Sequence, residues 1–126
     1  SDTSVLLHGD CHPKNILVDG TRLALIDLDQ AGAGAAACDI ASLLARLDHG
    51  VILGEHTTTA AVSLATAFLA GYSTVRPLPS PASMRWHQVA ALVAERAIRA
   101  VNRVNVRSLS RLDELVAFTL RRSEDL

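Results

Sequence analysis

The feature that most constrains this chain is a change in its hydrophobic pattern near residue 30. Before that point, two short apolar runs flank Asp19-Gly20, a pair typical of tight hairpin turns because both residues tolerate a positive φ. After it, apolar residues recur every three or four positions, which is the period of a helix buried on one face. The chain is therefore expected to adopt an α+β, mostly helical fold, with a β-hairpin followed by about four helices.

The β-structure is expected in the first thirty residues. The hairpin should pair strands over residues 16–18 and 22–28, and residues 4–7 form a further short apolar run that is typical of a strand. Between these segments, residues 8–15 are polar and contain Pro13, which indicates a loop.

Helix signals follow one another through the remainder of the chain. Asp39 lies in the first turn of the first helix, and Gly50 is expected to end it. In the last helix, Asp113 should complete a capping box. The expected ranges are 36–48, about 57–72, a third helix opened by the cap and first-turn proline of Ser80-Pro81, and a fourth from about Ser110.

The third helix is expected to carry two opposite stripes. Its apolar stripe should join the core and consists of Trp86, Val89, Ala90, Val93, Ala97, Val101 and Val104. Its basic stripe consists of Arg85, Arg96, Arg99, Arg103 and Arg107. Two interpretations of the basic stripe stay open, namely a solvated helix face and a surface for an anion or a partner.

Composition excludes several classes of protein. The chain has 126 residues, of which 49% are apolar and 20% charged, and this fits one folded domain over residues 1–126. It has no apolar run long enough to span a membrane, and its net charge of −1 argues against a nucleic-acid partner. Cys11 and Cys38 do not form a CxxC pair, so we expect no disulfide framework, two inert thiols and a reducing, cytoplasmic location.

Charge is unevenly distributed along the chain. Residues 1–63 hold eight acidic and three basic residues, whereas residues 64–126 hold five acidic and nine basic residues. An acidic half suits metal or cation handling, and a basic half suits anions or a solvated helix face.

The side chains best suited to chemistry lie in the loop over residues 8–15 and just after the hairpin. Because the hairpin returns the chain, Asp27 should lie close to Asn15. Carboxylate and amide oxygens are ligands that Mg²⁺ prefers, usually together with waters and substrate phosphates. Asp10 is then free to orient or deprotonate a hydroxyl that attacks phosphorus. This set of residues predicts metal-assisted phosphoryl transfer.

The pattern HGDxHxxNILVD, followed by a short hairpin, IDxD and Asp-Ile-Ala at residues 39–41, resembles the aminoglycoside phosphotransferase family, which includes choline-kinase-like enzymes. The resemblance covers about residues 5–47. It implies the C-terminal lobe of a protein-kinase-like fold, with a catalytic loop at 8–15 and a metal-binding hairpin at 16–29. It also implies Mg²⁺, ATP or another nucleoside triphosphate as phosphoryl donor, and the hydroxyl of a small molecule as acceptor.

The same resemblance implies roles for individual residues. Asp10 matches the catalytic base of the family. Asn15 and Asp27 match the residues that bind Mg²⁺ and, through it, the nucleotide. Asp29 fills a second acidic position and is expected to be an accessory metal ligand.

Further positions match residues that support the loop. Asp39 matches an aspartate that braces the catalytic loop from outside it, and His8 and His12 match positions that shape it. The three remaining histidines are expected to face solvent, and they are His49, His56 and His87.

The nucleotide-clamping N-terminal lobe of the family, with its Gly-rich loop and phosphate-binding lysine, is not found in this sequence. Lys14 is the only lysine, and it lies inside the loop. We therefore expect the missing lobe to be supplied by the same or another chain, and the fragment alone to be inactive. The alternative is a non-catalytic module, derived from a kinase lobe, that binds a partner or ligand.

The nature of the acceptor stays open between a sugar and an aminoglycoside-like compound. Family members that modify polycationic aminoglycosides are expected to present acidic pockets. The basic residues of 64–126 therefore favour a neutral or anionic hydroxyl compound, such as a sugar.

Two other motifs imitate unrelated functions. Residues 32–37 fit GxGxxA, a dinucleotide-binding pattern, but Asp27 and Asp29 just before it would repel a pyrophosphate. Asp10-Cys11-His12 imitates the D-x-H opening of metallophosphoesterases, but the later Gly-Asn-His element of that class is missing.

Overall fold

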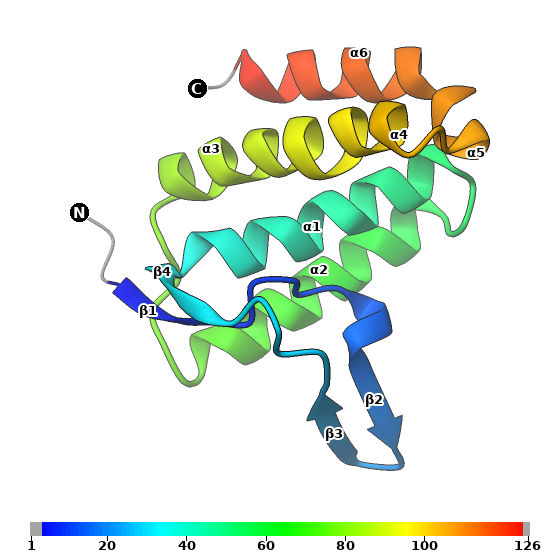
Figure 1. Ribbon diagram of the computed structural model, residues 1–126. Helices are drawn as coiled ribbons and strands as arrows, with labels where there is room; N and C mark the ends of the chain where they lie inside the picture. The colour runs from blue at the N-terminus through cyan, green and yellow to red at the C-terminus, as the bar shows by residue number, and fades with distance from the viewer. Residues whose placement is uncertain (1–3, 125–126) are drawn as a thin grey trace.

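The computed structural model describes residues 4–124 and consists of two small β-sheets beside a stack of helices (Figure 1). The strands are β1 (Ser4–Leu7), β2 (Ile16–Asp19), β3 (Arg22–Leu25) and β4 (Gly32–Ala35), and the 3₁₀ turn η1 (Pro13–Asn15) precedes β2. The helices are α1 (Ala37–Ile52), α2 (Thr58–Ser73), α3 (Pro81–Ala91), the π-helix η2 (Leu92–Ile98), α4 (Arg99–Asn102), α5 (Val106–Leu109) and α6 (Leu112–Ser123). The expected α+β, mostly helical fold is confirmed.

The expected hairpin is present, with two changes. β2 and β3 pair antiparallel, but the turn is Gly20-Thr21, and Asp19 stays in the strand. Gly20 has a φ of +59°, so one glycine supplies the left-handed conformation that the tight turn requires. The second strand ends at Leu25 rather than at residue 28, because Asp27 adopts a φ of +62°, which an extended strand does not contain.

A second, unexpected sheet pairs β1 with β4 in antiparallel register, from Ser4 opposite Ala35 to Leu7 opposite Gly32. The Gly/Ala stretch is therefore a strand, and it does not form a phosphate-binding loop. A Cβ at Gly34 would lie 2.6 Å from Leu7 Cδ1, so small residues in β4 give Leu7 room to pack. This sheet holds the chain entering the 8–15 loop beside the chain entering α1.

Helix α1 is the centre of the helical stack (Figure 1). It packs against α2 on one side and against α3 and η2 on the other, and α6 covers α3 and η2. The core where these helices meet consists of Ala45, Ala91, Leu92 and Leu115. Alanine at 45 lets the helices approach closely, and α1 is therefore buried on most of its sides. Within residues 4–124, no helix is long and apolar enough to cross a membrane.

Helix α1 continues to Ile52 and does not end at Gly50 as expected. Gly50 is buried beneath the His56 ring, and a Cβ at this position would lie 2.2 Å from His56 Cε1. The His56 ring in turn lies with Nε2 2.8 Å from the Leu47 carbonyl oxygen. Glycine at position 50 thus serves helix packing. The expectation that His56 faces solvent is wrong, and it is also wrong for His49, which is buried.

The face that the segment 81–104 buries differs from the expected apolar stripe. Trp86, Val93, Val101 and Val104 are exposed, at 58%, 42%, 54% and 70% of their surface. The buried positions are Ala91 and a series at four-residue intervals, Gln88, Leu92, Arg96 and Ala100. A π-helix has more residues per turn than an α-helix, so η2 rotates the residues that follow it, such as Val101 and Val104, away from the periodicity that predicts an α-helical stripe. Trp86 precedes η2, and it is exposed because α3 packs on α1 through another face, which includes Gln88 and Ala91.

The start of the last helix also differs from expectation. Ser110 is not its cap, because its hydroxyl donates to the Arg107 carbonyl, and α6 begins at Leu112 without a side-chain cap. The cap expected for the third helix is confirmed, since Ser80 Oγ accepts from the Ser83 N–H at 3.2 Å.

Candidate active site

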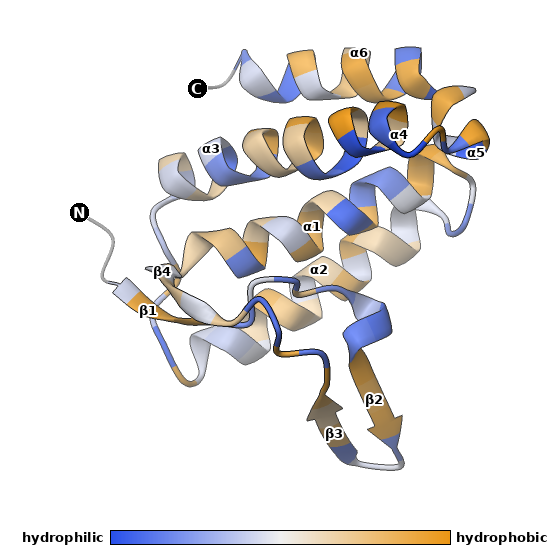
Figure 2. Cartoon of the chain, in the orientation of Figure 1, coloured by the Kyte–Doolittle hydropathy of each residue, from blue (hydrophilic) through white to orange (hydrophobic). Residues whose placement is uncertain are grey.

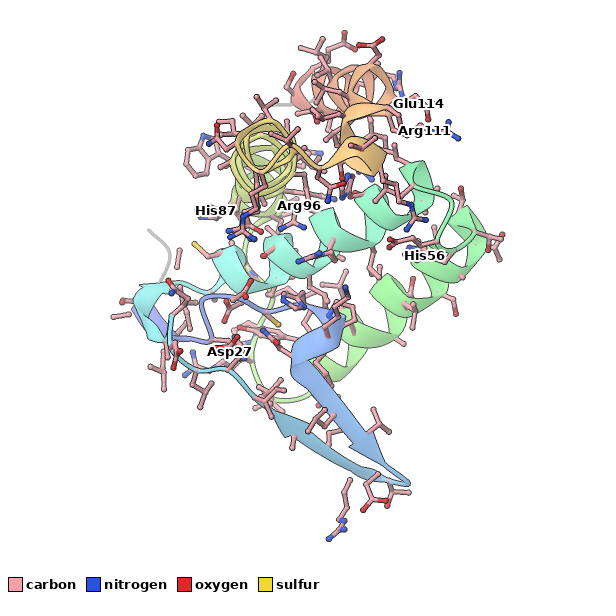
Figure 3. All side chains as sticks on the ribbon, turned by 45° about the vertical axis from the view of Figure 1, so that its right-hand side comes forward. Asp27, His56, His87, Arg96, Arg111 and Glu114 are labelled. Atoms are coloured by element: carbon pink, nitrogen blue, oxygen red, sulfur yellow. The ribbon has the colours of Figure 1, made fainter. Side chains whose placement is uncertain are left out.

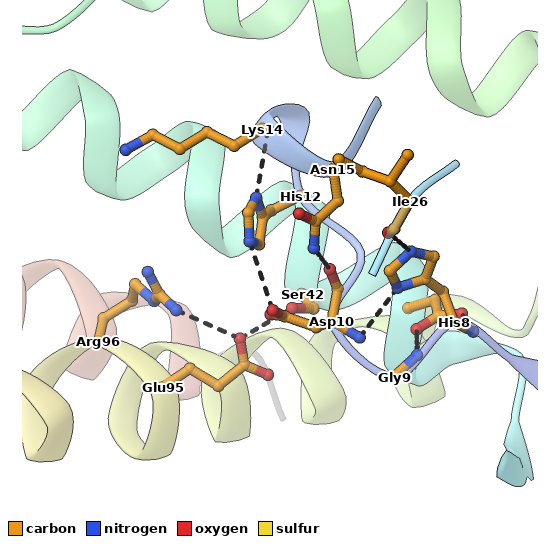
Figure 4. A network of polar contacts seen from close by, with 11 residues as sticks. His8, Gly9, Asp10, His12, Lys14, Asn15, Ile26, Ser42, Glu95 and Arg96 are labelled. Atoms are coloured by element: carbon orange, nitrogen blue, oxygen red, sulfur yellow. Dashed lines mark hydrogen bonds and ion pairs between the residues drawn. The ribbon is translucent and has the colours of Figure 1, made fainter. Parts of the chain in front are cut away.

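The loop over residues 8–15 links β1 to β2 and lies against the start of α1 (Figure 4). Asp39, in the first turn of α1, accepts the His8 N–H at 2.6 Å with Oδ2 and the Gly9 N–H at 2.9 Å with Oδ1. One carboxylate thus satisfies two adjacent backbone donors, which is a strong, charge-assisted arrangement. The expectation that Asp39 braces the loop is confirmed.

Gly9 allows the backbone of the loop to adopt its conformation. Its φ is +83°, a conformation that L side chains rarely adopt, and a Cβ here would lie 2.1 Å from the Gln30 carbonyl oxygen. The turn after the hairpin therefore presses directly on the loop, and only glycine leaves space for it.

His8 is buried and connects the loop to the end of the hairpin (Figure 4). Its Nδ1 accepts the Asp10 N–H at 3.3 Å, and its Nε2 lies 2.9 Å from the Ile26 carbonyl oxygen. A single tautomer, with the proton on Nε2, satisfies both contacts. His8 therefore shapes the loop, as the resemblance implies.

Asp10 is half-buried, and its carboxylate Oδ2 lies 3.4 Å from His12 Nε2. His12 is itself held by its Nδ1, which accepts the Lys14 N–H at 3.2 Å. Burial, followed by the charge of Arg46, lowers the pKa of His12, and Asp10 opposes this shift. At neutral pH the imidazole is thus a neutral hydrogen-bonding neighbour of the Asp10 carboxylate, and His12 shapes the loop as expected.

Asn15 ends the loop and is buried. Its amide Nδ2 donates to the Asp10 carbonyl at 3.0 Å, which orients the side chain and leaves the amide oxygen as the atom suited to a cation. Its backbone carbonyl accepts the Ile26 N–H at 3.0 Å. The hairpin therefore brings the chain at Asp27 back beside Asn15, as expected.

Asp27 is exposed and has a left-handed backbone conformation. A non-glycine residue with positive φ is uncommon, although aspartate tolerates it better than most, and such residues cluster at functional sites. Asp29 lies further on, in an exposed turn closed by the Ala31 N–H donating to the Leu28 carbonyl at 2.9 Å. The structure therefore brings Asp27 next to the loop, and the role of Asp29 as an accessory ligand stays a prediction.

The residues present fit a partial magnesium site. Within residues 4–124, no three His, Cys, Asp or Glu side chains gather in a metal-holding group. An Asn–Asp pair does not need a third such ligand, because Mg²⁺ commonly completes its coordination with waters and substrate phosphates. The oriented amide of Asn15 and the exposed carboxylate of Asp27 suit this kind of site.

Cys11 lies within the loop but is buried. Burial, followed by the negative charges of Asp39 and Asp10, raises the pKa of its thiol to about 11. The thiol therefore stays protonated at neutral pH and is a poor nucleophile, in agreement with the inert role expected for it.

Several residues beside Asp10 were not found from the sequence (Figure 4). Ser42 Oγ donates to Glu95 Oε2 at 2.8 Å, and Glu95 lies 3.6 Å from the Arg96 guanidinium. Ser42 lies three residues after Asp39, so it shares a helix face with the brace, and this spacing is the signal that could have found it. Arg96 belongs to the basic stripe of the sequence, but its 6% exposure shows that the solvated-face interpretation is wrong for this residue.

An aspartate on a braced loop, with an asparagine and a second aspartate meeting at the following hairpin, is typical of the catalytic lobe of phosphotransferases. Residues 1–87 match the phosphotransferase enzyme family APH, and the chain belongs to this family. The resemblance inferred from the sequence is thus confirmed. No curated protein and no solved structure matches the chain.

Proposed function

We propose that this chain is the catalytic lobe of a phosphotransferase that uses Mg²⁺ and ATP to phosphorylate the hydroxyl of a small molecule. The observation that carries the proposal is the 8–15 loop, in which Asp10 is held between His8, His12 and Asn15 and braced by Asp39. A fixed carboxylate beside an Asn–Asp pair suited to Mg²⁺ is the set of groups that phosphoryl transfer requires, because catalysis of this reaction depends on positioning and charge stabilisation.

In this proposal Asp10 is the catalytic base. The acceptor oxygen attacks the γ-phosphorus of ATP while the bond from that phosphorus to the β–γ bridging oxygen breaks. ADP leaves with the electron pair of that bond, and Asp10 takes the hydroxyl proton. Asp10 is half-buried and has a neutral neighbour in His12, which suits a carboxylate that must meet a hydroxyl.

Asn15 and Asp27 would hold the magnesium ion, and Asp29 is proposed as an accessory ligand. When bound, the ion neutralises charge on the transferring phosphoryl group. The amide oxygen of Asn15 and the carboxylate of Asp27 supply ligands from the two ends of the hairpin.

We also propose that a nucleotide-binding lobe, from the same or another chain, covers the hairpin. Figure 2 shows β2 and β3 as strongly hydrophobic ribbons that extend away from the helices. Contiguous exposed apolar residues of this kind mark interaction surfaces. The exposed apolar residues of this segment are Leu17, Val18, Leu23, Leu25, Ile26 and Leu28. We place the enzyme in the cytoplasm, where Mg²⁺ and ATP are available.

The test uses the native-length protein that contains these residues and measures ADP formation with a panel of hydroxyl compounds. Asp10→Asn should lower kcat by about 10²–10⁴-fold, the contribution typical of general acid–base catalysis. Asp27→Ala should raise the KM for Mg²⁺·ATP, because it removes a charged ligand of the metal. The variant should also need a higher Mg²⁺ concentration for half-maximal activity.

The matched control is Asp113→Asn, which changes an exposed aspartate in the first turn of α6, outside the loop and the hairpin. This variant should keep the activity of the unchanged protein. If no hydroxyl compound gives ADP formation that depends on Asp10, the phosphotransferase proposal fails and the non-catalytic binding module is favoured.

A further inference from the structure

Beside the Asp10 loop lies a cavity of about 480 Å³, formed by the loop, α1, η2, α4 and α5. Its lining is strongly basic. Six of its residues carry a positive charge at neutral pH, and they are Lys14, Arg46, Arg96, Arg99, Arg103 and Arg107. Two carboxylates, Glu55 and Glu95, lie among them.

Arg96 and Arg46 are set apart from the exposed cations of this cavity, because Arg96 is buried and Arg46 is half-buried. Arg96 is 6% exposed, and its guanidinium lies between η2 and α1 (Figure 3). In the part of the chain that the structure describes, three buried side-chain nitrogen atoms lack a hydrogen-bond partner, and all three belong to residues of this cavity. They are Arg46 Nε, His49 Nε2 and Arg96 Nε. Buried donors are nearly always satisfied in folded proteins, so the two arginine Nε atoms show that the protein itself does not fully compensate the positive charge in the wall of this cavity.

The two carboxylates do not neutralise the cavity. Glu95 accepts the Ser42 hydroxyl and lies 3.6 Å from Arg96, and Glu55 lies 3.2 Å from Arg107. The remaining positive charge affects its neighbours. Burial, followed by the charge of Arg46, lowers the pKa of Arg96 to about 10. Burial, followed by the charges of Arg96 and Arg46, lowers the pKa of His49 to about 4. A bound anion would relieve this repulsion.

The cavity adjoins the base of the proposed reaction. His12 lines the cavity and also lies 3.4 Å from the Asp10 carboxylate. Burial lowers the pKa of both Arg46 and Arg96, and the negative charge of Asp10 opposes this shift at both residues. A small molecule with an anionic group among these arginines can therefore place a hydroxyl at Asp10.

We propose that this cavity binds the oxyanion group, a phosphate or carboxylate, of an anionic acceptor whose hydroxyl meets Asp10. The inference rests on the proposed phosphotransferase function and names its substrate class. The products are the phosphorylated acceptor, ADP and one proton, which Asp10 takes from the hydroxyl. Guanidinium groups suit this role, because their planar fork of N–H donors matches phosphate and carboxylate oxygens.

The experiment measures steady-state kinetics of the native-length protein with three sets of acceptors. Sugar phosphates and hydroxycarboxylates are the two anionic sets, which separate phosphate from carboxylate recognition. The corresponding neutral sugars and alcohols form the third set. We expect one anionic set to give a kcat/KM about tenfold or more above that of its neutral counterparts, which is the ratio expected when a charge-assisted contact is gained.

Two cavity variants and one control test the site. Arg46→Gln and Arg99→Gln should each raise the KM for the anionic acceptor by about tenfold, with the KM for ATP unchanged, since each removes a charged donor. Arg99 is exposed, so its variant is not expected to disturb the core. Arg85→Gln is the control, because Arg85 is exposed on α3 and lies outside the cavity lining.

The outcomes separate this inference from the proposed function. If phosphorylation depends on Asp10 but neutral acceptors react as well as anionic ones, or if the cavity variants behave like Arg85→Gln, the anionic-acceptor inference is overturned while the phosphotransferase stands. If no acceptor of any set is phosphorylated in an Asp10-dependent manner, both are overturned. The inference is supported if one anionic set gives a higher kcat/KM than its neutral counterparts and if both cavity variants abolish this difference.

Discussion

At the scale of single residues, the conformation of the Asp10 loop depends on Gly9. Two separate constraints act there, a φ of +83° and a position where a Cβ would lie 2.1 Å from the Gln30 carbonyl oxygen. Gly54 has only the first constraint, because its φ is +70° but a Cβ there would meet no atom within 4 Å beyond its chain neighbours. Alanine substitutions at the two glycines therefore distinguish the cost of backbone strain, which both share, from the cost of steric overlap, which only Gly9 has.

We expect Gly54→Ala to lower the free energy of unfolding by about 1–2 kcal/mol, the cost of a left-handed L-residue. Gly9→Ala should lower it by about 2–5 kcal/mol, because overpacking adds to the same strain. Urea unfolding of the native-length protein measures both. Equal losses for the two variants would show that the turn containing Gln30 moves freely away from the loop.

The placement of Asp10 and Asn15 together in one loop could be predicted from the sequence, because the two residues are close in the chain and their spacing is a local property. Their roles stay predictions. The brace from Asp39 could be predicted only through the family resemblance. The burial of Arg96 could not be predicted, since it depends on how η2 packs against α1, and the charge of arginine by itself favours an exposed position.

At the scale of elements, the most important contact joins the first turn of α1 to the loop. Asp39 is positioned by the helix and accepts two loop N–H groups, so the loop and the helix N-terminus are fixed as one unit. Asp113 also lies in the first turn of a helix, α6, but it is exposed. It provides a comparison in which an aspartate interacts favourably with the helix dipole alone.

We expect Asp39→Asn to lower the free energy of unfolding by about 1.5–3 kcal/mol, since an amide has one acceptor oxygen and cannot serve both donors as a carboxylate does. Its kcat should decrease as well, because Asp10 loses its fixed position. Asp113→Asn should cost about 0.3–1 kcal/mol and leave kcat unchanged. Thermal unfolding and ADP formation are the two measurements, and an unchanged kcat in Asp39→Asn would contradict the positioning role.

The helices themselves were predicted best where the local signals were complete. Ser80-Pro81 predicted the start of α3 correctly, because a cap and a first-turn proline act within a few residues. The buried face of the segment 81–104 was predicted wrongly for two reasons. From Leu92 onward the π-helix changes the number of residues per turn, and nothing in the local pattern indicates it. Before Leu92, the exposure of Trp86 depends on which face of α3 packs on α1, which is a tertiary contact. β4 was missed because its Gly/Ala sequence has low strand propensity, and its pairing with β1 is a tertiary contact.

At the scale of the whole molecule, the uneven charge of the sequence has a spatial counterpart. The acidic first half supplies the loop and hairpin carboxylates, and the basic second half supplies most of the arginines that line the neighbouring cavity. The acidic half was expected to suit metal or cation handling, and the basic half either anions or a solvated helix face. We propose that the acidic half handles the magnesium ion of the nucleotide and that the basic half binds the anionic acceptor of the same reaction. The fold joins them, because η2 packs on the helix that also braces the loop.

The buried positive charge of the cavity predicts how the stability of the molecule depends on pH. His49 has an ordinary pKa of 6.5 in the unfolded chain and a pKa lowered to about 4 in the folded protein, by burial and then by Arg96 and Arg46. Between these values the unfolded chain binds a proton on His49 that the folded protein excludes. Stability from this residue is therefore fully present above pH 6.5 and decreases as the pH falls toward 4. His12 shifts in the same direction.

We expect the free energy of unfolding to decrease by about 1 kcal/mol through His49 between about pH 7.5 and pH 5.5, a range above the ordinary titration of carboxylates. His49→Gln should remove most of this decrease, because the protonated form no longer exists to favour the unfolded chain. His87→Gln, at a half-buried position outside the cavity, is the control and should keep the full dependence. Urea unfolding at the two pH values measures it. If His49→Gln retains the dependence, burial and the charges of Arg96 and Arg46 do not act on His49 in the folded protein, and the case for a buried positive charge beside Asp10 is weakened.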